Sequence, residues 1–320
     1  MSQEPRFFIL RGGAIGDFIV TLPAINALRQ RWPHAYIELA GYPRIAQFAQ
    51  AKKLVDKVVS LDRADMARLF SHNPEISAAQ KKHIASFAFI LSYLYDPTLT
   101  VKANLLASGA KKVLSCSPLI KDVHAIDHLF APLQELGIRP KGNEQAHIRL
   151  SPEHVAGGQA RMSVYGPKVA LIHPGSGSPG KNWPLPKFLE IGARIKREFG
   201  WAPVFALGEA DNAIRKELTR LPQKIRILSD CSLIELAECL SACSLYVGND
   251  SGVTHIAAAL GKPVTAIFGP TDPNLWAPRG RHVSVVRSES KTPESLASLD
   301  VNTVWQHVVS CRRHDNKNSS

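Results

Sequence analysis

Short apolar runs alternate along this chain with segments whose apolar residues recur at helical spacing. The run at 7–10 predicts a buried strand, and the three- and four-residue spacing of apolar side chains over about 17–32 predicts a helix that Pro33 ends. Strand–helix alternation of this kind is typical of α/β proteins with a parallel sheet covered by helices on both faces. We therefore expect an α/β fold.

The same alternation continues to about residue 268. In the first half we expect strands at 36–40, 57–61, 87–94 and 112–115, and a helix at 125–136 that ends at Gly137. In the second half we expect strands at 169–172, 204–207, 226–228, 245–247 and 264–268, and helices at 185–199, 212–221, 233–242 and 253–260.

Glycine and proline are concentrated at 151–167, and we interpret this stretch as a domain boundary. The expected domains are 1–158 and 159–301, which suits a chain of 320 residues. A C-terminal segment, 302–320, is expected to hold a helix that can cross back to the first domain and a disordered tail at 316–320. Ligands of such sheets bind beyond the carboxyl ends of the strands, so strand-end loops of both domains can line one cleft.

Composition narrows the class of protein. Lys and Arg number 39 against 27 Asp and Glu, a net charge of +12, which favours nucleic acid, anionic lipid surfaces or phosphorylated substrates as partners. No nucleic-acid-binding motif accompanies the charge, so we expect no nucleic-acid partner. Five scattered cysteines without a Cys-x-x-Cys pair suit a reducing cytoplasm. With no signal segment and no apolar run long enough to cross a bilayer, we expect a cytoplasmic protein that can contact the inner face of the membrane.

The first loop of interest follows the 7–10 strand. Gly12 and Gly13 let the backbone approach a ligand closely, and Asp17 begins the next helix, where its carboxylate can act as a general base. The alternative is structural, because Asp is favoured at a helix N-terminus. The glycine spacing does not match G-x-G-x-x-G, and no acidic residue ends the second strand, which disfavours a nicotinamide enzyme.

The second loop, 173–184, follows the first strand of the second domain. It is rich in small residues such as Ser176 and includes Lys181, a pattern that suits a diphosphate, although it is not a Walker loop. A solvated turn with a surface lysine is an equally good interpretation.

Two further loops end strands of the second domain. In the loop at 248–255, Ser251 and Gly252 leave room for a phosphate at a helix N-terminus, and His255 can donate a hydrogen bond to it. A capped helix with a core histidine is the alternative. Asp250 is better suited to anchoring the loop or binding a sugar hydroxyl. The loop at 269–273 is either a proline-rich turn or a wall of the same pocket.

Other chemistry has no support in the sequence. Twelve histidines are present, but none has the spacing of a zinc-binding H-E-x-x-H motif, and no G-x-S-x-G elbow occurs. We therefore expect no metal site.

Together the four loops resemble the ADP-heptose:lipopolysaccharide heptosyltransferase family, glycosyltransferase family nine. The resemblance is strongest over 7–43 and 168–280, and weak over about 63–150. The matching segments are Gly16-Asp17 followed by Thr21-Leu22-Pro23-Ala24, then Lys181-Asn182-Trp183-Pro184, Asn249-Asp250-Ser251-Gly252 with His255, and Gly269-Pro270-Thr271-Asp272-Pro273. The family more often has threonine where Ser251 stands.

The resemblance implies two facing Rossmann-like domains of the GT-B type with a central cleft. It implies inverting, metal-independent transfer of a heptose from ADP-heptose to a lipopolysaccharide inner-core acceptor, a phosphorylated glycolipid at the inner-membrane surface, with ADP as product and no cofactor. By the same resemblance Asp17 matches the proposed catalytic base and Lys181 a lysine at the donor phosphates. Asp250, Ser251, Gly252 and His255 match the donor-binding loop.

Two other functions stay open on the residues alone. A nucleotide-sugar epimerase can share the architecture and works without an acceptor, and a non-catalytic nucleotide- or glycan-binding module needs no base at Asp17. The region at 63–130 matches nothing that transfers residue by residue, so the acceptor, the linkage and the donor sugar are open.

Overall fold

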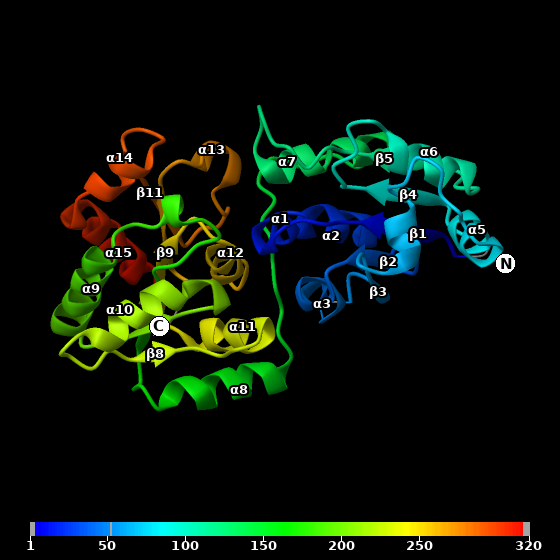
Figure 1. The fold of residues 1–320 in the computed structure, drawn as a ribbon. Helices are drawn as coiled ribbons and strands as arrows, with labels where there is room; N and C mark the ends of the chain where they lie inside the picture. The colour runs from blue at the N-terminus through cyan, green and yellow to red at the C-terminus, as the bar shows by residue number, and fades with distance from the viewer. Residues whose placement is uncertain (1–3, 52, 316–320) are drawn as a thin grey trace. The chain divides into compact units, whose positions relative to one another are not determined.

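The computed structural model describes residues 4–51 and 53–315, which form two α/β units, Met1–Glu144 and Gln145–Ser320 (Figure 1). Each unit holds one all-parallel sheet with helices around it. The expected α/β class with two Rossmann-like domains is confirmed. The predicted disordered tail at 316–320 lies outside the described residues.

The first unit has a five-stranded sheet in the order β3-β2-β1-β4-β5. Its central strand is buried over the whole run Phe7 to Leu10, and Phe7 stacks on Phe89 of the neighbouring strand with ring centroids 4.2 Å apart. Helices cover both faces, which explains continuous apolar runs instead of alternation. The strands are β1 (Arg6–Leu10), β2 (Tyr36–Gly41), β3 (Lys57–Ser60), β4 (Phe89–Ser92) and β5 (Val113–Ser115).

The helix predicted at 17–32 is two helices, α1 (Ile15–Ile19) and α2 (Leu22–Arg31). Pro23 has no N–H to continue the first helix, and the side chain of Thr21 donates instead to the Asp17 carbonyl at 2.7 Å. Proline also divides the helix predicted at 125–136 into α7 and the 3₁₀ helix η1. The other helices of this unit are α3 (Pro43–Ala51), α4 (Ala64–Arg68), α5 (Ala78–Ala85), α6 (Thr100–Ala107), α7 (Ala125–Leu129) and η1 (Ala131–Leu136).

The second unit has a six-stranded sheet in the order β11-β10-β9-β6-β7-β8. Four of its strands match the predicted positions closely, the short edge strand β8 is confirmed, and β11 was missed. The strands are β6 (Val169–His173), β7 (Ala202–Ala206), β8 (Ile227–Leu228), β9 (Leu245–Asn249), β10 (Val264–Phe268) and β11 (Val283–Arg287).

The C-terminal helix α15 (Val301–Asp315) packs on this second sheet. Val304 and Val308 are fully buried in the same apolar core as Trp183, and the helix lies against β10 and β11. The described part of this helix docks within the second unit. The expected crossing to the first domain stays a prediction. The remaining helical elements here are η2 (Pro179–Lys181), α9 (Leu185–Arg194), η3 (Ile195–Phe199), η4 (Glu209–Asp211), α10 (Asn212–Arg220), α11 (Leu233–Ala242), α12 (Gly252–Ala259), α13 (Pro273–Trp276) and α14 (Pro293–Ser298).

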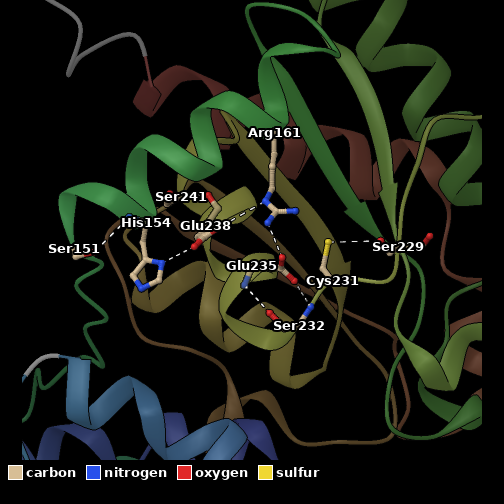
Figure 2. Close-up of polar contacts among 9 residues, drawn as sticks. All are labelled: Ser151, His154, Arg161, Ser229, Cys231, Ser232, Glu235, Glu238 and Ser241. Atoms are coloured by element: carbon tan, nitrogen blue, oxygen red, sulfur yellow. Dashed lines mark hydrogen bonds and ion pairs between the residues drawn. The ribbon is translucent and has the colours of Figure 1, made fainter.

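Gly157 and Gly158, two of the glycines interpreted as a domain boundary, lie in a helix, α8 (Pro152–Ser163), which packs against α11 in the second unit. A Cβ at Gly158 would lie 2.1 Å from the main-chain oxygen of Glu238, so glycine permits the close approach of the two helices. Figure 2 shows the polar side of this contact, where His154 Nδ1 lies 2.5 Å from Glu238 Oε1 and Arg161 Nη2 lies 2.5 Å from Glu235 Oε1. The boundary lies after Glu144, not near residue 158.

Within the part of the chain that the structure describes, no helix combines the length and the apolar character needed to span a bilayer.

Candidate functional site

In both sheets the order in which the chain adds strands reverses between two neighbouring strands. In the first unit the chain runs outward from β1 to β3 and returns at β4, so β1 and β4 flank the switch point. In the second unit β6 and β9 flank it in the same way. The crevice at such a point, beyond the carboxyl ends of the strands, is where open α/β sheets bind ligands. The loops after β1, β6 and β9 therefore lie where the sequence predicted a site.

Asp17 lies in the first turn of α1 and takes part in capping that helix. Its Oδ2 accepts a hydrogen bond from the Ala14 N–H at 2.8 Å, and its Oδ1 lies 3.8 Å from Nη2 of Arg11. The side chain is 28% exposed. Asp17 thus has the helix-capping role that the sequence offered as the alternative to a general base. Its Oδ1 has a more distant partner than its Oδ2.

Arg11 binds the first turn of α1 through hydrogen bonds from its buried side chain. This residue was not singled out from the sequence. Its side chain is 2% exposed. Its Nη2 donates to the Asp17 carbonyl at 2.6 Å, and its Nε donates to Thr21 Oγ1 at 2.9 Å. Burial lowers the pKa of Arg11, and the charge of Asp17 opposes that shift. The position of an arginine directly after a buried strand was the available signal.

Gly13 and Gly12 differ in what they contribute. Gly13 has φ +94°, and a Cβ there would lie 2.8 Å from Asp17 Oδ2, so glycine is required both by the backbone and by the carboxylate. A Cβ at Gly12 would make only ordinary contacts at 3.6 Å with Leu61 and Leu94. Gly13 is the residue that shapes the loop.

In the second unit the loops after β6 and β9 meet through Lys181 and Asp250. Lys181 Nζ donates to Asp250 Oδ2 at 2.9 Å, although the two residues are 69 positions apart. The lysine side chain is 37% exposed and the aspartate 9%. The structure therefore places an accessible cation beside the loop that starts α12, and Asp250 anchors that cation.

Ser251 is the N-cap of α12, the helix whose first turn was predicted to bind phosphate. Its Oγ accepts from the Thr254 N–H at 3.4 Å and lies 3.2 Å from Thr254 Oγ1. Gly252 follows as the first helical residue, and His255 is buried at 4% exposure. The cation at Lys181 and the positive end of α12 thus lie at one switch point.

Residues 118–305 match the family "Glycosyltransferase family 9 (heptosyltransferase)". That match covers more than half of the chain, including the Lys181 loop and α12. The chain belongs to glycosyltransferase family 9.

Relatives of this glycosyltransferase support the assignment over a longer span. The lipopolysaccharide heptosyltransferase 1 of Salmonella typhimurium is 24% identical over 336 residues, covering 95% of this chain and 99% of that protein.

Solved structures share its fold. The E. coli ADP-heptose lps heptosyltransferase II has a TM-score of 0.79 at 17% identity, covering 97% of this chain and 99% of that one. The iron-containing dodecameric glycosyltransferase TibC of E. coli has a TM-score of 0.62 at 14% identity, covering 97% of this chain and 77% of that one.

The remaining predicted residues of this glycosyltransferase have local partners. Ser176 Oγ donates to the Ser178 carbonyl at 2.6 Å within its own loop. In the fourth loop Asp272 caps α13 and pairs with Lys291 at 2.6 Å, and hydrogen bonding to that lysine lowers the pKa of Asp272. These contacts give both loops a structural role, and ligand binding there stays a prediction.

No group of three or more His, Cys, Asp and Glu side chains suited to a metal ion occurs among residues 4–51 and 53–315.

Proposed function

We propose that this glycosyltransferase moves a heptose from ADP-heptose to a lipopolysaccharide inner-core acceptor, with inversion and without a metal ion. The observation that carries the proposal is the pairing of Lys181 and Asp250 at 2.9 Å beside the N-terminus of α12. A fixed cation next to the positive end of a helix is chemistry that suits a nucleoside diphosphate. The family and the names of its relatives supply the heptose and the acceptor.

Lys181 and α12 act on the leaving group. Negative charge grows on the diphosphate as the bond to the sugar breaks, so contacts to its oxygens strengthen toward the transition state. One ammonium hydrogen of Lys181 is directed to Asp250, which leaves two for phosphate oxygens. Loss of such a donor costs about 3–4 kcal/mol of barrier in comparable oxyanion sites.

Asp17 acts as the general base that deprotonates the acceptor hydroxyl. The Ala14 N–H holds Oδ2 at 2.8 Å, which orients the carboxylate, while the side chain stays 28% exposed. The activated hydroxyl then attacks the anomeric carbon from the face opposite the diphosphate, which inverts the configuration there.

The cationic helix terminus also supports metal independence, because positive charge from the protein can replace that of a divalent ion. A chelator such as EDTA is expected to leave turnover unchanged. Loss of turnover that added iron or magnesium restores would refute this part of the proposal, and the iron-containing TibC makes iron the first metal to try.

We further propose that this enzyme works at the inner face of the cytoplasmic membrane, where a phosphorylated glycolipid acceptor would lie. The net charge of +12 supports that location, since a basic protein is attracted to anionic headgroups.

Two measurements test the function. A thermal-shift screen of nucleotide diphosphates, nucleotide sugars and NAD should show that ADP stabilises the protein more than UDP, GDP or NAD. Asp17→Asn should abolish transfer to a heptose-deficient acceptor while ADP affinity by calorimetry is retained, since the amide keeps the size of the side chain and loses its basicity. Normal turnover of Asp17→Asn would remove the base, and a preference for UDP would change the donor.

Release of a sugar-epimerised donor without acceptor would instead support the epimerase alternative. Membership in a glycosyltransferase family favours transfer.

A further inference from the structure

Asn249, the last residue of β9, is fully buried at the switch point of the second sheet. Its Oδ1 accepts a hydrogen bond from the Trp183 N–H at 3.0 Å, and its Nδ2 donates to the Pro174 carbonyl at 2.8 Å. These two partners stand at opposite ends of the loop that carries Lys181. One side chain therefore closes both ends of that loop onto β9.

We propose that Asn249 is a positioning residue of the diphosphate pocket. It holds residues 174–183 in the shape that brings Lys181 Nζ beside Asp250 and the first turn of α12. This role rests on the proposed function, because it acts through the contact of Lys181 with phosphate.

The amide of Asn249 suits both partners at this position. The site needs one acceptor for Trp183 N–H and one donor for the Pro174 carbonyl, and a carboxylate or an aliphatic side chain supplies at most one of them. Each main-chain group would otherwise be buried without a partner at this fully enclosed point. The loop would then shift until water reaches those groups, and Lys181 would move with it.

The main chain of Asn249 is held as firmly as its side chain. Thr254 Oγ1 donates to the Asn249 carbonyl at 2.5 Å and also lies 3.0 Å from the hydroxyl of Tyr246. The same Thr254 hydroxyl lies 3.2 Å from Ser251 Oγ, the cap of α12. Asn249 thus links the Lys181 loop to the phosphate-binding end of the helix.

A double-mutant cycle on the full chain tests the positioning role, with ADP affinity measured by calorimetry. We expect Asn249→Ala to weaken ADP binding about tenfold, the usual effect of one lost charged contact. In the Lys181→Ala background the same change should weaken binding less than twofold, because the contact it positions is already gone. Asn249→Ser, which keeps a hydroxyl, serves as a second variant if the alanine variant does not fold.

Asn104 provides the matched control. It is another buried asparagine that donates to two main-chain carbonyls, those of Leu69 at 2.9 Å and Ser71 at 2.7 Å, in the first unit. Asn104→Ala should lower the thermal midpoint and leave ADP affinity unchanged.

The outcomes distinguish the positioning role of Asn249 from the phosphate contact of Lys181. Equal losses of affinity from Asn249→Ala in both backgrounds, or no loss where Lys181→Ala does weaken ADP, would overturn the positioning role alone. An unchanged affinity in Lys181→Ala would overturn the phosphate contact of the proposed function, and the positioning role with it.

Discussion

Gly158 and Gly157 are neighbours on one helix, and the structure predicts opposite results when each becomes alanine. A Cβ at Gly158 would lie 2.1 Å from the Glu238 oxygen and 2.5 Å from its carbonyl carbon, both main-chain atoms of α11. A Cβ at Gly157 would lie 3.4 Å from Glu238 Oε2, an ordinary contact with a side chain. The pair therefore tests the steric consequence of the close approach of α8 and α11.

The expected magnitude follows from these distances. At Gly158 the two helices must separate by about 1 Å to restore ordinary contact, and overpacking of this kind costs about 3 kcal/mol at the upper end of its usual range. Helix propensity favours alanine over glycine by about 1 kcal/mol at either position. Gly158→Ala should therefore lose about 2 kcal/mol of stability, and Gly157→Ala should gain up to about 1 kcal/mol. Because propensity is common to both, their difference isolates the steric cost.

Urea unfolding followed by tryptophan fluorescence measures this difference. Of the five tryptophans, only Trp32 belongs to the first unit, so the signal reports chiefly on the second. Separation of the helices should also weaken the pairs of His154 and Arg161 with α11 that Figure 2 shows. Equal unfolding midpoints for Gly157→Ala and Gly158→Ala would refute the reasoning.

Three other predictions concern single residues. Gly13→Ala should reduce kcat with little change in ADP affinity, because the added Cβ would lie 2.8 Å from Asp17 Oδ2 and would push the carboxylate away. An unchanged kcat would contradict this prediction. Burial lowers the pKa of His173 from 6.5, so on acidification through pH 6.5 the unfolded chain takes up the proton before the folded protein does, and stability falls. His173→Asn should therefore flatten the dependence of the unfolding free energy on pH between about 5 and 7. An unaltered slope would contradict this prediction. Burial raises the pKa of Cys239 to about 12, so a thiol reagent at about pH 8 should label the native protein at the half-buried Cys231 before Cys239, and the reverse order would exclude that burial.

Much of the second unit could be predicted from its sequence because the information is local. β6, β9 and β10 are apolar on both faces and are followed directly by loops rich in small residues, so strand, strand end and candidate site follow from adjacent residues. The candidate residues Lys181, Asp250 and Ser251 were identified this way. Their proximity was an inference from the parallel topology, which brings the carboxyl ends of strands to one edge.

The errors lie where distant residues decide the local structure. Gly157 and Gly158 are typical of a linker when only their neighbours are considered, and only the Glu238 main chain, 80 positions away, shows why a helix needs them. The break between α1 and α2 was visible in Pro23, but the capture of the Asp17 carbonyl by Arg11 was not.

The sequence by itself determined the strand and helix pattern, the loops that end each buried strand and the family motifs in them, because these depend on side-chain periodicity and residue type. Tertiary structure alone decided that Asn249 closes the Lys181 loop, that Asp250 pairs with that lysine, and that α15 packs on the second sheet. Such contacts join residues tens of positions apart, and their hydrogen bonds exist only once the sheet has set the distance between the strand ends.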